Sequence, residues 1–153
     1  CTFVWCRSSN ITINDKNHIQ SAIVNNSNSI SHHIADTILD KNNPMYENSI
    51  NTLGLIVGAN HQDLLKYIRS IDQTIPILLP GIGAQKGNLK DAVLAGLGTD
   101  LGTLIINSTR SIIYASSSKT NFQKHIRLAA TDFNNQLNSI LLDTMEWDWL
   151  SFK

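Results

Sequence analysis

Four short apolar runs, each followed by a segment with helical spacing, set the strongest limit on the fold of this chain. They are nearly continuous in Phe, Val, Ile and Leu and comprise Thr2–Cys6, Leu53–Val57, Ile75–Leu79 and Thr103–Ile106. Such runs are typical of parallel strands that are covered on both faces. Because strand and helix alternate four times, the sequence predicts an α/β fold with a parallel sheet.

Apolar spacing and capping residues locate the helices. The segments expected to be helical are Ile30–Ile38, Leu64–Ile71, Leu89–Ala95 and Phe122–Leu141. Asn60 and Asn88 are the predicted N-caps of the second and third helices. Thr120 and Gln123 form a capping box at the start of the last one, whose apolar residues follow a 3.6-residue period. The polar segment 14–28 is expected to be a loop with a frayed turn.

The number of strand–helix units restricts the architecture. Four units make half of a (β/α)₈ barrel, which typically needs ~250 residues. This chain has 153 residues, so we expect residues 1–153 to form one partial TIM-barrel domain with a C-terminal helix and tail. The chain starts at Cys1, directly before a strand, which suggests a processed or incomplete sequence. An open doubly wound sheet is the competing architecture.

Composition excludes several classes of protein. Apolar residues make up 42% of the chain, and 12 basic side chains balance 12 acidic ones. This balance gives no general attraction to nucleic acid or to anionic lipid, and no apolar run approaches the ~20 residues that cross a membrane. Cys1 and Cys6 lie too far apart along a strand to form a disulfide, which favours a reduced, cytoplasmic location. The histidines lack the spacing of metal ligands.

Two loops carry the residues that suggest a function. The segment Pro80–Gly87 contains three glycines directly after the third strand, and Asn88 then opens a helix whose N-terminus favours anions. The fourth strand ends in Asn107–Ser111, which includes Arg110, and a brief extra helix is expected there. A guanidinium can hold a phosphate through two hydrogen bonds. Barrels often bind phosphate with the loops after strands seven and eight, so the two loops predict that these strands are five to eight.

The residues of these loops resemble those of a known family. Ile77–Gln85 and Ile105–Ala115 are similar to the closing signatures of orotidine 5′-phosphate decarboxylase, in its longer bacterial type-2 branch. Arg7–Asn10 resembles the Thr-Ser-Asn segment of that branch, and Leu53–Ala59 resembles its next strand. Order and spacing agree over nearly the whole chain. The resemblance implies the C-terminal half of a TIM barrel.

The resemblance also implies roles for individual residues. Ser9 would bond to the pyrimidine, and Gln85 would bridge phosphate and base. Arg110 would hold the phosphate together with backbone amides near Gly83 and Thr109. The family converts orotidine 5′-phosphate to UMP and CO₂ in pyrimidine biosynthesis without a metal or an organic cofactor. The resemblance therefore implies that the complete protein has a small-molecule substrate and forms a homodimer. No nucleic-acid or membrane partner is expected.

The sequence departs from the family pattern in several places. Ile11, Lys86 and Ser111 stand where the family usually has Pro, Gly and Gly. The family's reaction centre, Asp-x-Lys-x-x-Asp with a further Lys, has no match anywhere in the chain. We therefore expect no catalytic residue in this segment and no decarboxylation by the isolated chain. The missing motif is expected on preceding strands of a longer chain.

Two other functions are compatible with the loops. A natural half-barrel would bind a phosphorylated nucleotide without chemistry. Another phosphosugar-handling barrel would share only the phosphate loops, although the Ser8–Asn10 segment argues against it. The apolar tail Met145–Phe152 is expected to pack across the outer helices, or alternatively to form an oligomer contact.

Overall fold

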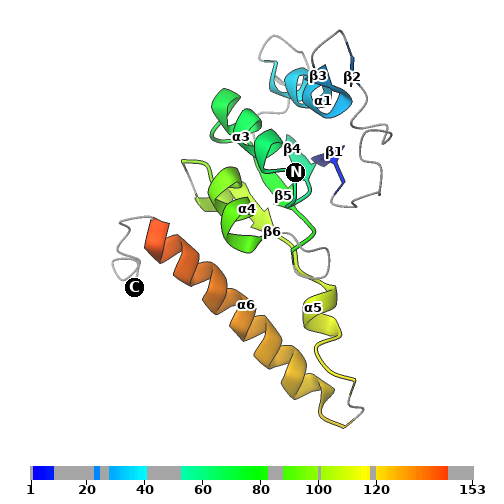
Figure 1. The fold of residues 1–153 in the computed structure, drawn as a ribbon, viewed down its shortest axis with the longest axis vertical. Coiled ribbons are helices and arrows are strands. Elements are labelled where there is room, and N and C mark those ends of the chain that lie inside the picture. The colour runs from blue at the N-terminus through cyan, green and yellow to red at the C-terminus, as the bar shows by residue number, and fades with distance from the viewer. Residues whose placement is uncertain are drawn as a thin grey trace. The chain divides into compact units, whose positions relative to one another are not determined.

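The computed structural model describes residues 2–8, 23–24, 28–40, 53–82, 88–99, 101–117 and 120–144 (Figure 1). Its main elements are β1 (Thr2–Arg7), α1 (Ile30–Leu39), β4 (Leu53–Val57), α3 (Gln62–Ile71), β5 (Ile77–Leu79), α4 (Leu89–Gly96), β6 (Leu104–Ile106), α5 (Arg110–Ile113) and α6 (Phe122–Thr144). They fall into two compact units, Cys1–Asn107 and Ser108–Lys153.

The first unit is built on a four-stranded parallel sheet. Its strand order is β1-β4-β5-β6, and every neighbouring pair is parallel. A register shift interrupts the pairing of β1 with β4 between Trp5 and Arg7. The order follows the chain, as expected for successive right-handed strand–helix units. The α/β class and the parallel sheet predicted from the four apolar runs are therefore confirmed.

One face of this sheet is buried beneath the helices. The row Val4, Leu55, Ile77 and Leu104 runs across the four strands, and Leu55 and Ile77 in it have no exposed surface. A Cβ added at Gly96 of α4 would lie 3.1 Å from a methyl carbon of Leu104, so α4 packs directly on this face. The core of the unit thus lies between this face and the helices α1, α3 and α4.

The opposite face is apolar but much less covered. Its central row is Trp5, Ile56, Leu78 and Ile105, one residue from each strand. Trp5 is 59% exposed and Ile105 is 46% exposed, while Ile56 and Leu78 are half-buried. Burial on both faces was expected from the sequence; within the described residues, the helices bury only one.

A buried arginine joins the helical layer to the sheet. Arg69 of α3 is 4% exposed, and its Nε donates to Gly96 O at 2.7 Å. Its terminal nitrogens donate to Ile75 O at 2.8 Å and to Thr103 O at 3.1 Å. Burial lowers the pKa of Arg69 to about 10, against the opposing effect of Asp72, so the side chain stays charged at neutral pH. One guanidinium therefore satisfies carbonyls from three separate segments.

The N-terminal strand and helix are joined by polar contacts. Cys6 is fully buried on β1, and its Sγ donates to Ser31 O of α1 at 3.0 Å. Burial raises the pKa of this thiol to about 12, so it remains protonated. The hydroxyl of Tyr67 on α3 donates to Asp36 Oδ1 of α1 at 2.5 Å, and its ring makes an edge contact with His32.

The described part of the second unit, residues 108–117 and 120–144, contains two helices. The brief extra helix predicted after the fourth strand is α5, and the long terminal helix is α6. The expected apolar stripe of α6 is its least exposed side, since Ile126, Phe133 and Leu137 are intermediate in exposure. Among the described residues of α6, however, none is buried. The described residues of this unit therefore leave the apolar stripe of α6 partly exposed.

Several sequence-based boundaries need correction. The segment 14–28 was expected to be a loop, but Ile23–Val24 and Asn28–Ser29 form the short antiparallel strands β2 and β3. The third strand begins at Ile77 instead of Ile75, because Pro76 has no N–H to donate to a neighbouring strand. The fourth begins at Leu104, because Leu101–Thr103 forms a 3₁₀ turn.

Two predicted helix caps also shift. The N-cap of α3 is His61 instead of Asn60, since the turn after β4 continues one residue further. The helix α6 begins at Phe122, one residue later than a box with Thr120 as N-cap requires. Asn88 is confirmed as the N-cap of α4, where its side chain accepts from the backbone N–H of Asp91 at 3.4 Å. Met145–Phe152 lies outside the described residues.

Candidate functional site

The carboxyl ends of the four parallel strands meet at one edge of the sheet. Backbone bonds join the loops that leave it: Gly58 N donates to Arg7 O at 2.9 Å, and Ala59 N donates to Pro80 O at 2.9 Å. Asn107 N donates to Leu79 O at 3.1 Å. In sheets and barrels of this kind, ligands bind at the carboxyl edge. Hydrogen bonds thus link the segments that directly follow the four strands of the first unit.

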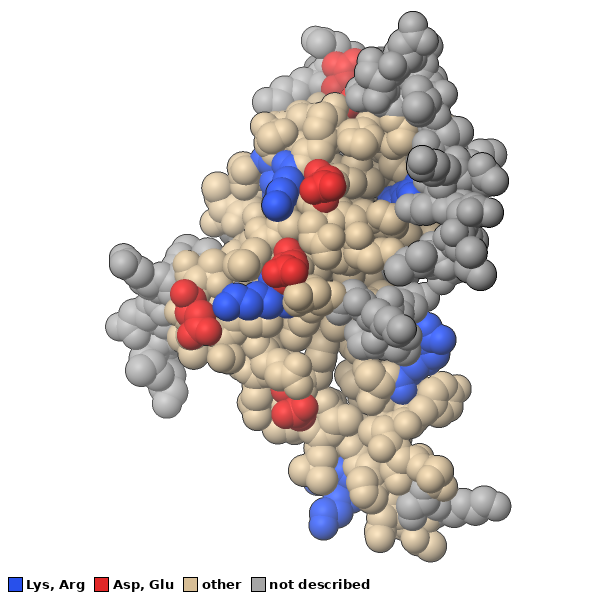
Figure 2. All heavy atoms as spheres, in the orientation of Figure 1, with Lys and Arg blue, Asp and Glu red and all other residues tan. Residues whose placement is uncertain are grey.

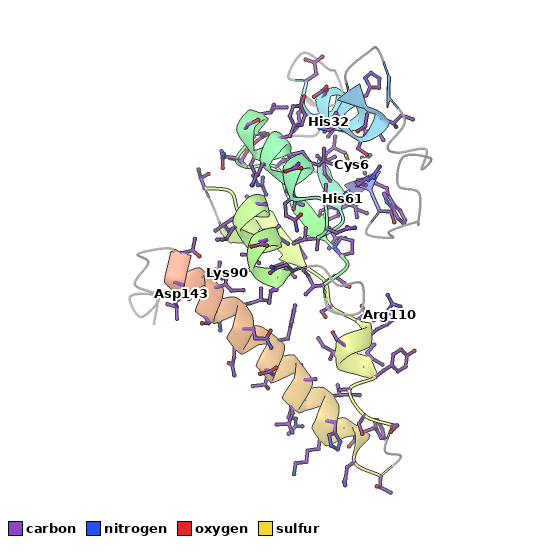
Figure 3. All side chains as sticks on the ribbon, viewed as in Figure 1. Cys6, His32, His61, Lys90, Arg110 and Asp143 are labelled. Carbon is purple, nitrogen blue, oxygen red and sulfur yellow. The ribbon has the colours of Figure 1, made fainter. Side chains whose placement is uncertain are left out.

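A histidine connects the loops after β1 and β4. His61 Nε2 lies 2.8 Å from Ser8 O and 3.3 Å from Nε of the buried Arg7 (Figure 3). If Nε2 carries a proton, it can donate to Ser8 O, but it then has no lone pair to accept a hydrogen bond from Arg7 Nε–H. The carbonyl contact is shorter, and two acceptors at 2.8 Å would repel each other, so we assign the proton to Nε2.

The loop after β5 begins with a glycine-specific conformation. Gly81 has a φ of 97°, in the left-handed region that side chains rarely adopt. Its neighbour Ile82 is buried. This geometry accounts for the first glycine of the glycine-rich segment. On the other side of that segment, the side-chain nitrogen of Asn88 also donates to Asp91 Oδ2 at 2.8 Å, closing the first turn of α4.

An unpaired acceptor lies in the loop after β4. The Oδ1 atom of Asn60 is buried and has no hydrogen-bond partner, which is uncommon for a buried polar atom. The residue was predicted to cap α3, a role that would have satisfied this oxygen.

The second predicted loop belongs to the second unit. Thr109 is the N-cap residue of α5, and its carbonyl accepts from Ile112 and Ile113, at 3.1 and 2.8 Å. Arg110, the first residue of α5, is exposed (Figure 3). Ser111, which departs from the family pattern, shares a hydrogen bond of 2.6 Å with the hydroxyl of Ser108. The serine is thus accommodated, and the Arg110 guanidinium is accessible to an anion from solvent.

The predicted substrate-binding residues are only partly described. Ser9, Gly83 and Gln85 lie outside the described residues, as do Ile11 and Lys86. Thr109 and Arg110 fall in a different unit from the strand ends. Their assembly into one phosphate and pyrimidine site therefore stays a prediction.

Sequence reasoning passed over two well-connected side chains. His61 was considered only as a metal ligand, and Arg69 was given no role. The signal for His61 was its place just beyond a strand end, where functional side chains of α/β folds gather. No group of three or more metal-ligating side chains occurs among the residues that the structure describes.

Charges are interspersed on the molecular surface. Figure 2 shows basic and acidic side chains, some of them next to one another, scattered among neutral ones on the face in view. No described helix is long and apolar enough to cross a membrane.

Comparison with known proteins identifies the family. No protein-family model matches the chain. The orotidine 5′-phosphate decarboxylase of Paracidovorax citrulli is 35% identical over 137 residues, which are 90% of this chain and 47% of that protein. That of Verminephrobacter eiseniae is 36% identical over 115 residues, 75% of this chain and 40% of that protein. The chain belongs, as a partial region, to the orotidine 5′-phosphate decarboxylase family.

Solved structures agree with this assignment. The UMP synthase of Leishmania donovani matches with a TM-score of 0.71 and 30% identity, over 90% of this chain and 27% of that one. The OMP decarboxylase of the same organism matches with a TM-score of 0.67 and 28% identity, over 90% of this chain and 47% of that one. The chain therefore spans somewhat less than half the length of the decarboxylases and 27% of the UMP synthase. Its parallel sheet is consistent with part of a TIM barrel.

Proposed function

We propose that this chain is the phosphate- and pyrimidine-binding half of an orotidine 5′-phosphate decarboxylase, comprising strands five to eight of a TIM barrel. The match to decarboxylases over 90% of the chain carries this proposal. Complete, the enzyme would release CO₂ from orotidine 5′-phosphate to give UMP, as a cytoplasmic homodimer without cofactor. The Asp-x-Lys-x-x-Asp reaction centre would lie in the part of the barrel that this chain does not span.

The uncovered face of the sheet supports a partial barrel. In a complete barrel, residues from eight strands fill the interior in layers. The row of Trp5, Ile56, Leu78 and Ile105 has the apolar character of such a layer, although Trp5 and Ile105 are 59% and 46% exposed. Among the described strands, β1 pairs only with β4 and β6 only with β5, so each has an edge available for another strand. Four further parallel strands would cover the row and both edges.

In this proposal one half of the barrel binds the phosphate and the other half carries the reaction centre, and this division is consistent with the reaction. Contacts to a remote phosphate stabilise the transition state when their binding energy is used at the reacting carbon. The exposed Arg110 is available for such a contact. The described lysines Lys66, Lys90 and Lys124 lie within helices α3, α4 and α6, so none stands at a strand end to stabilise a carbanion. The chain would thus hold substrate without completing the reaction.

Nucleotide binding by the purified chain tests the proposal. UMP is titrated into the wild-type chain and into Arg110→Ala, with Arg127→Ala on α6 as an exposed control. We expect Arg110→Ala to weaken UMP binding about 10- to 100-fold, because hydrogen bonds to charged groups contribute ~1.5–3 kcal/mol. Arg127→Ala should bind like the wild type. Equal affinities for all three would remove the phosphate role of Arg110.

Turnover assays test the position of the reaction centre. The chain alone should release no CO₂ from orotidine 5′-phosphate, whereas a longer chain that also carries Asp-x-Lys-x-x-Asp should do so. The coding sequence is expected to continue upstream in the same frame and to contain this motif ~100 residues or more earlier. Decarboxylation by the purified 153-residue chain would contradict the proposal.

A further inference from the structure

The uncovered face of the sheet carries an apolar row that is most exposed at its two ends. The members of this open row, one from each strand, are Trp5, Ile56, Leu78 and Ile105. Trp5 and Ile105, the two exposed members, belong to the outer strands β1 and β6. Two residues before Trp5, the Phe3 ring lies against Gly54, so the chain packs that part of the face by itself. The open row and the edges beside it are what a partner would cover.

Both outer strands are able to pair with further strands. Among the described strands, β1 pairs only with β4 and β6 only with β5, so each has one unpaired edge. Neither strand contains the proline or lysine that often protects an exposed edge, and β6 is entirely aliphatic. The formal net charge of the chain is zero, so two copies would not repel each other through net charge.

The size of a stable interface restricts what can cover this face. Fully enclosed aromatic side chains bury ~150–250 Å², so Trp5, at 59% exposure, offers on the order of 100 Å². A specific interface buries ~800 Å² on each partner, and the open row alone falls short of this area. A single added strand would pair with one edge and leave the other unpaired. The partner must therefore cover the row and pair with both edges at once.

We infer that this partner is a second copy of the chain, and that two copies close an eight-stranded parallel barrel. A two-fold axis parallel to the strands places β6 of one copy beside β1 of the other, with both strands running in the same direction. The same rotation joins the other two edges, so neither copy keeps an unpaired edge in this sheet. Eight is the number of strands at which side chains just fill the interior of a barrel.

The arrangement of each copy agrees with this assembly. The helices α1, α3 and α4 cover the face opposite the open row, so they lie outside the closed barrel, and the two open rows fill its interior. The inference goes beyond the proposed function, because it requires neither nucleotide binding nor decarboxylation. It concerns the association of the 153-residue chain with itself.

The mass of the purified chain in solution tests the inference. Light scattering after size-exclusion chromatography should give twice the mass of one chain. Trp5→Lys and Ile105→Lys each place a charge on the open row, at a position that is exposed within one copy. Each should raise the dissociation constant of the dimer about 100-fold or more, because the charge would be buried without a partner. Leu128→Lys, at a similarly exposed leucine of α6, is the matched control and should leave the dimer intact.

Three results would overturn the inference. They are a wild-type chain with the mass of one copy, larger assemblies without a dimer, and a dimer that Leu128→Lys dissociates while Ile105→Lys does not. The last result would place the contact on α6. All three leave the proposed function standing, since UMP titration and turnover test that function separately.

The fluorescence of Trp5 locates the contact. Trp147→Phe combined with Trp149→Phe leaves Trp5 as the only tryptophan of the chain. In the dimer, its emission should lie at shorter wavelength than after Ile105→Lys, because the indole is removed from water. Dilution below the dissociation constant should shift the emission to longer wavelength, which keeps the test valid if Ile105→Lys fails to fold. A dimer whose Trp5 emission changes in neither comparison would refute the inference, because another surface would then hold the copies together.

Discussion

Replacing Arg69 with methionine removes a buried donor group while keeping a side chain of comparable length. In the wild type, the guanidinium donates to Gly96 O, Ile75 O and Thr103 O at 2.7, 2.8 and 3.1 Å. A weaker contact of 3.3 Å reaches Asp72 O. The substitution therefore leaves carbonyls of α4, of the loop before β5 and of the 3₁₀ turn before β6 without their donor.

The expected cost follows from the number of these bonds. Hydrogen bonds to charged groups contribute ~1.5–3 kcal/mol each, and an unsatisfied buried acceptor costs a further ~1–3 kcal/mol. The substitution also removes the free-energy cost of burying the guanidinium charge, and this offsets several kcal/mol of the loss. We therefore expect Arg69→Met to lower the free energy of unfolding by ~3–5 kcal/mol.

Urea denaturation followed by tryptophan fluorescence measures this difference. The control is Arg127→Met, which changes an exposed arginine of α6 and should shift the unfolding free energy by less than ~0.5 kcal/mol. Arg69→Lys should fall between the two, since the three N–H groups of an ammonium leave a single nitrogen, whereas the guanidinium reaches the three carbonyls from three different nitrogens. If Arg69→Met unfolds within ~1 kcal/mol of the wild type, the three carbonyls are satisfied by water and the reasoning is refuted.

Three further substitutions test other parts of the first unit. Tyr67→Phe should lower the unfolding free energy by ~1–2 kcal/mol through loss of the bond to Asp36. That bond raises the pKa of Tyr67 to about 12, so absorbance titration of the variant should lack the phenol that titrates at about 12. The stabilisation by this bond should be full below the ordinary tyrosine pKa and vanish as pH rises through about 12. Burial would raise the pKa of Asp72, but hydrogen bonds from the following turn prevail and lower it. The free energy of unfolding should therefore fall as the pH drops through this lowered pKa. In Asp72→Asn, the unfolding free energy should decline less steeply with acid. Gly54→Ala should cost ~1–3 kcal/mol in urea denaturation, because a Cβ there would lie 2.5 Å from the Phe3 ring.

Local patterns predicted the elements of this protein well. The run Leu53–Val57 is β4 at the predicted bounds, and the isoleucine spacing of the first helix corresponds to α1, Ile30–Leu39. These predictions succeeded because the period of apolar residues reflects which side of an element is buried. The cap at Asn60 failed because the choice between two adjacent polar residues depends on how the preceding turn packs, which no local pattern records.

The candidate site divides in the same way. The glycine at position 81 and the cap at Asn88 could be predicted, because each depends on the backbone of a few consecutive residues. The link between His61 and Ser8 could not, since it joins residues 53 positions apart through one side-chain nitrogen. Ser9, Gly83 and Gln85 are still known only from their resemblance to the family.

By itself, the sequence determined the α/β class, the four parallel strands, the glycine-rich and arginine-containing loops, and the family that those loops resemble. Its apolar runs could not distinguish the two faces of the sheet. Only the tertiary structure decided that Leu55 and Ile77 lie beneath helices while Trp5 and Ile105 remain exposed. The physical reason is that a continuous run of apolar residues indicates that both faces of a strand can be buried, but it does not say which elements bury them. The neighbours of each face are determined by the packing of the elements in three dimensions.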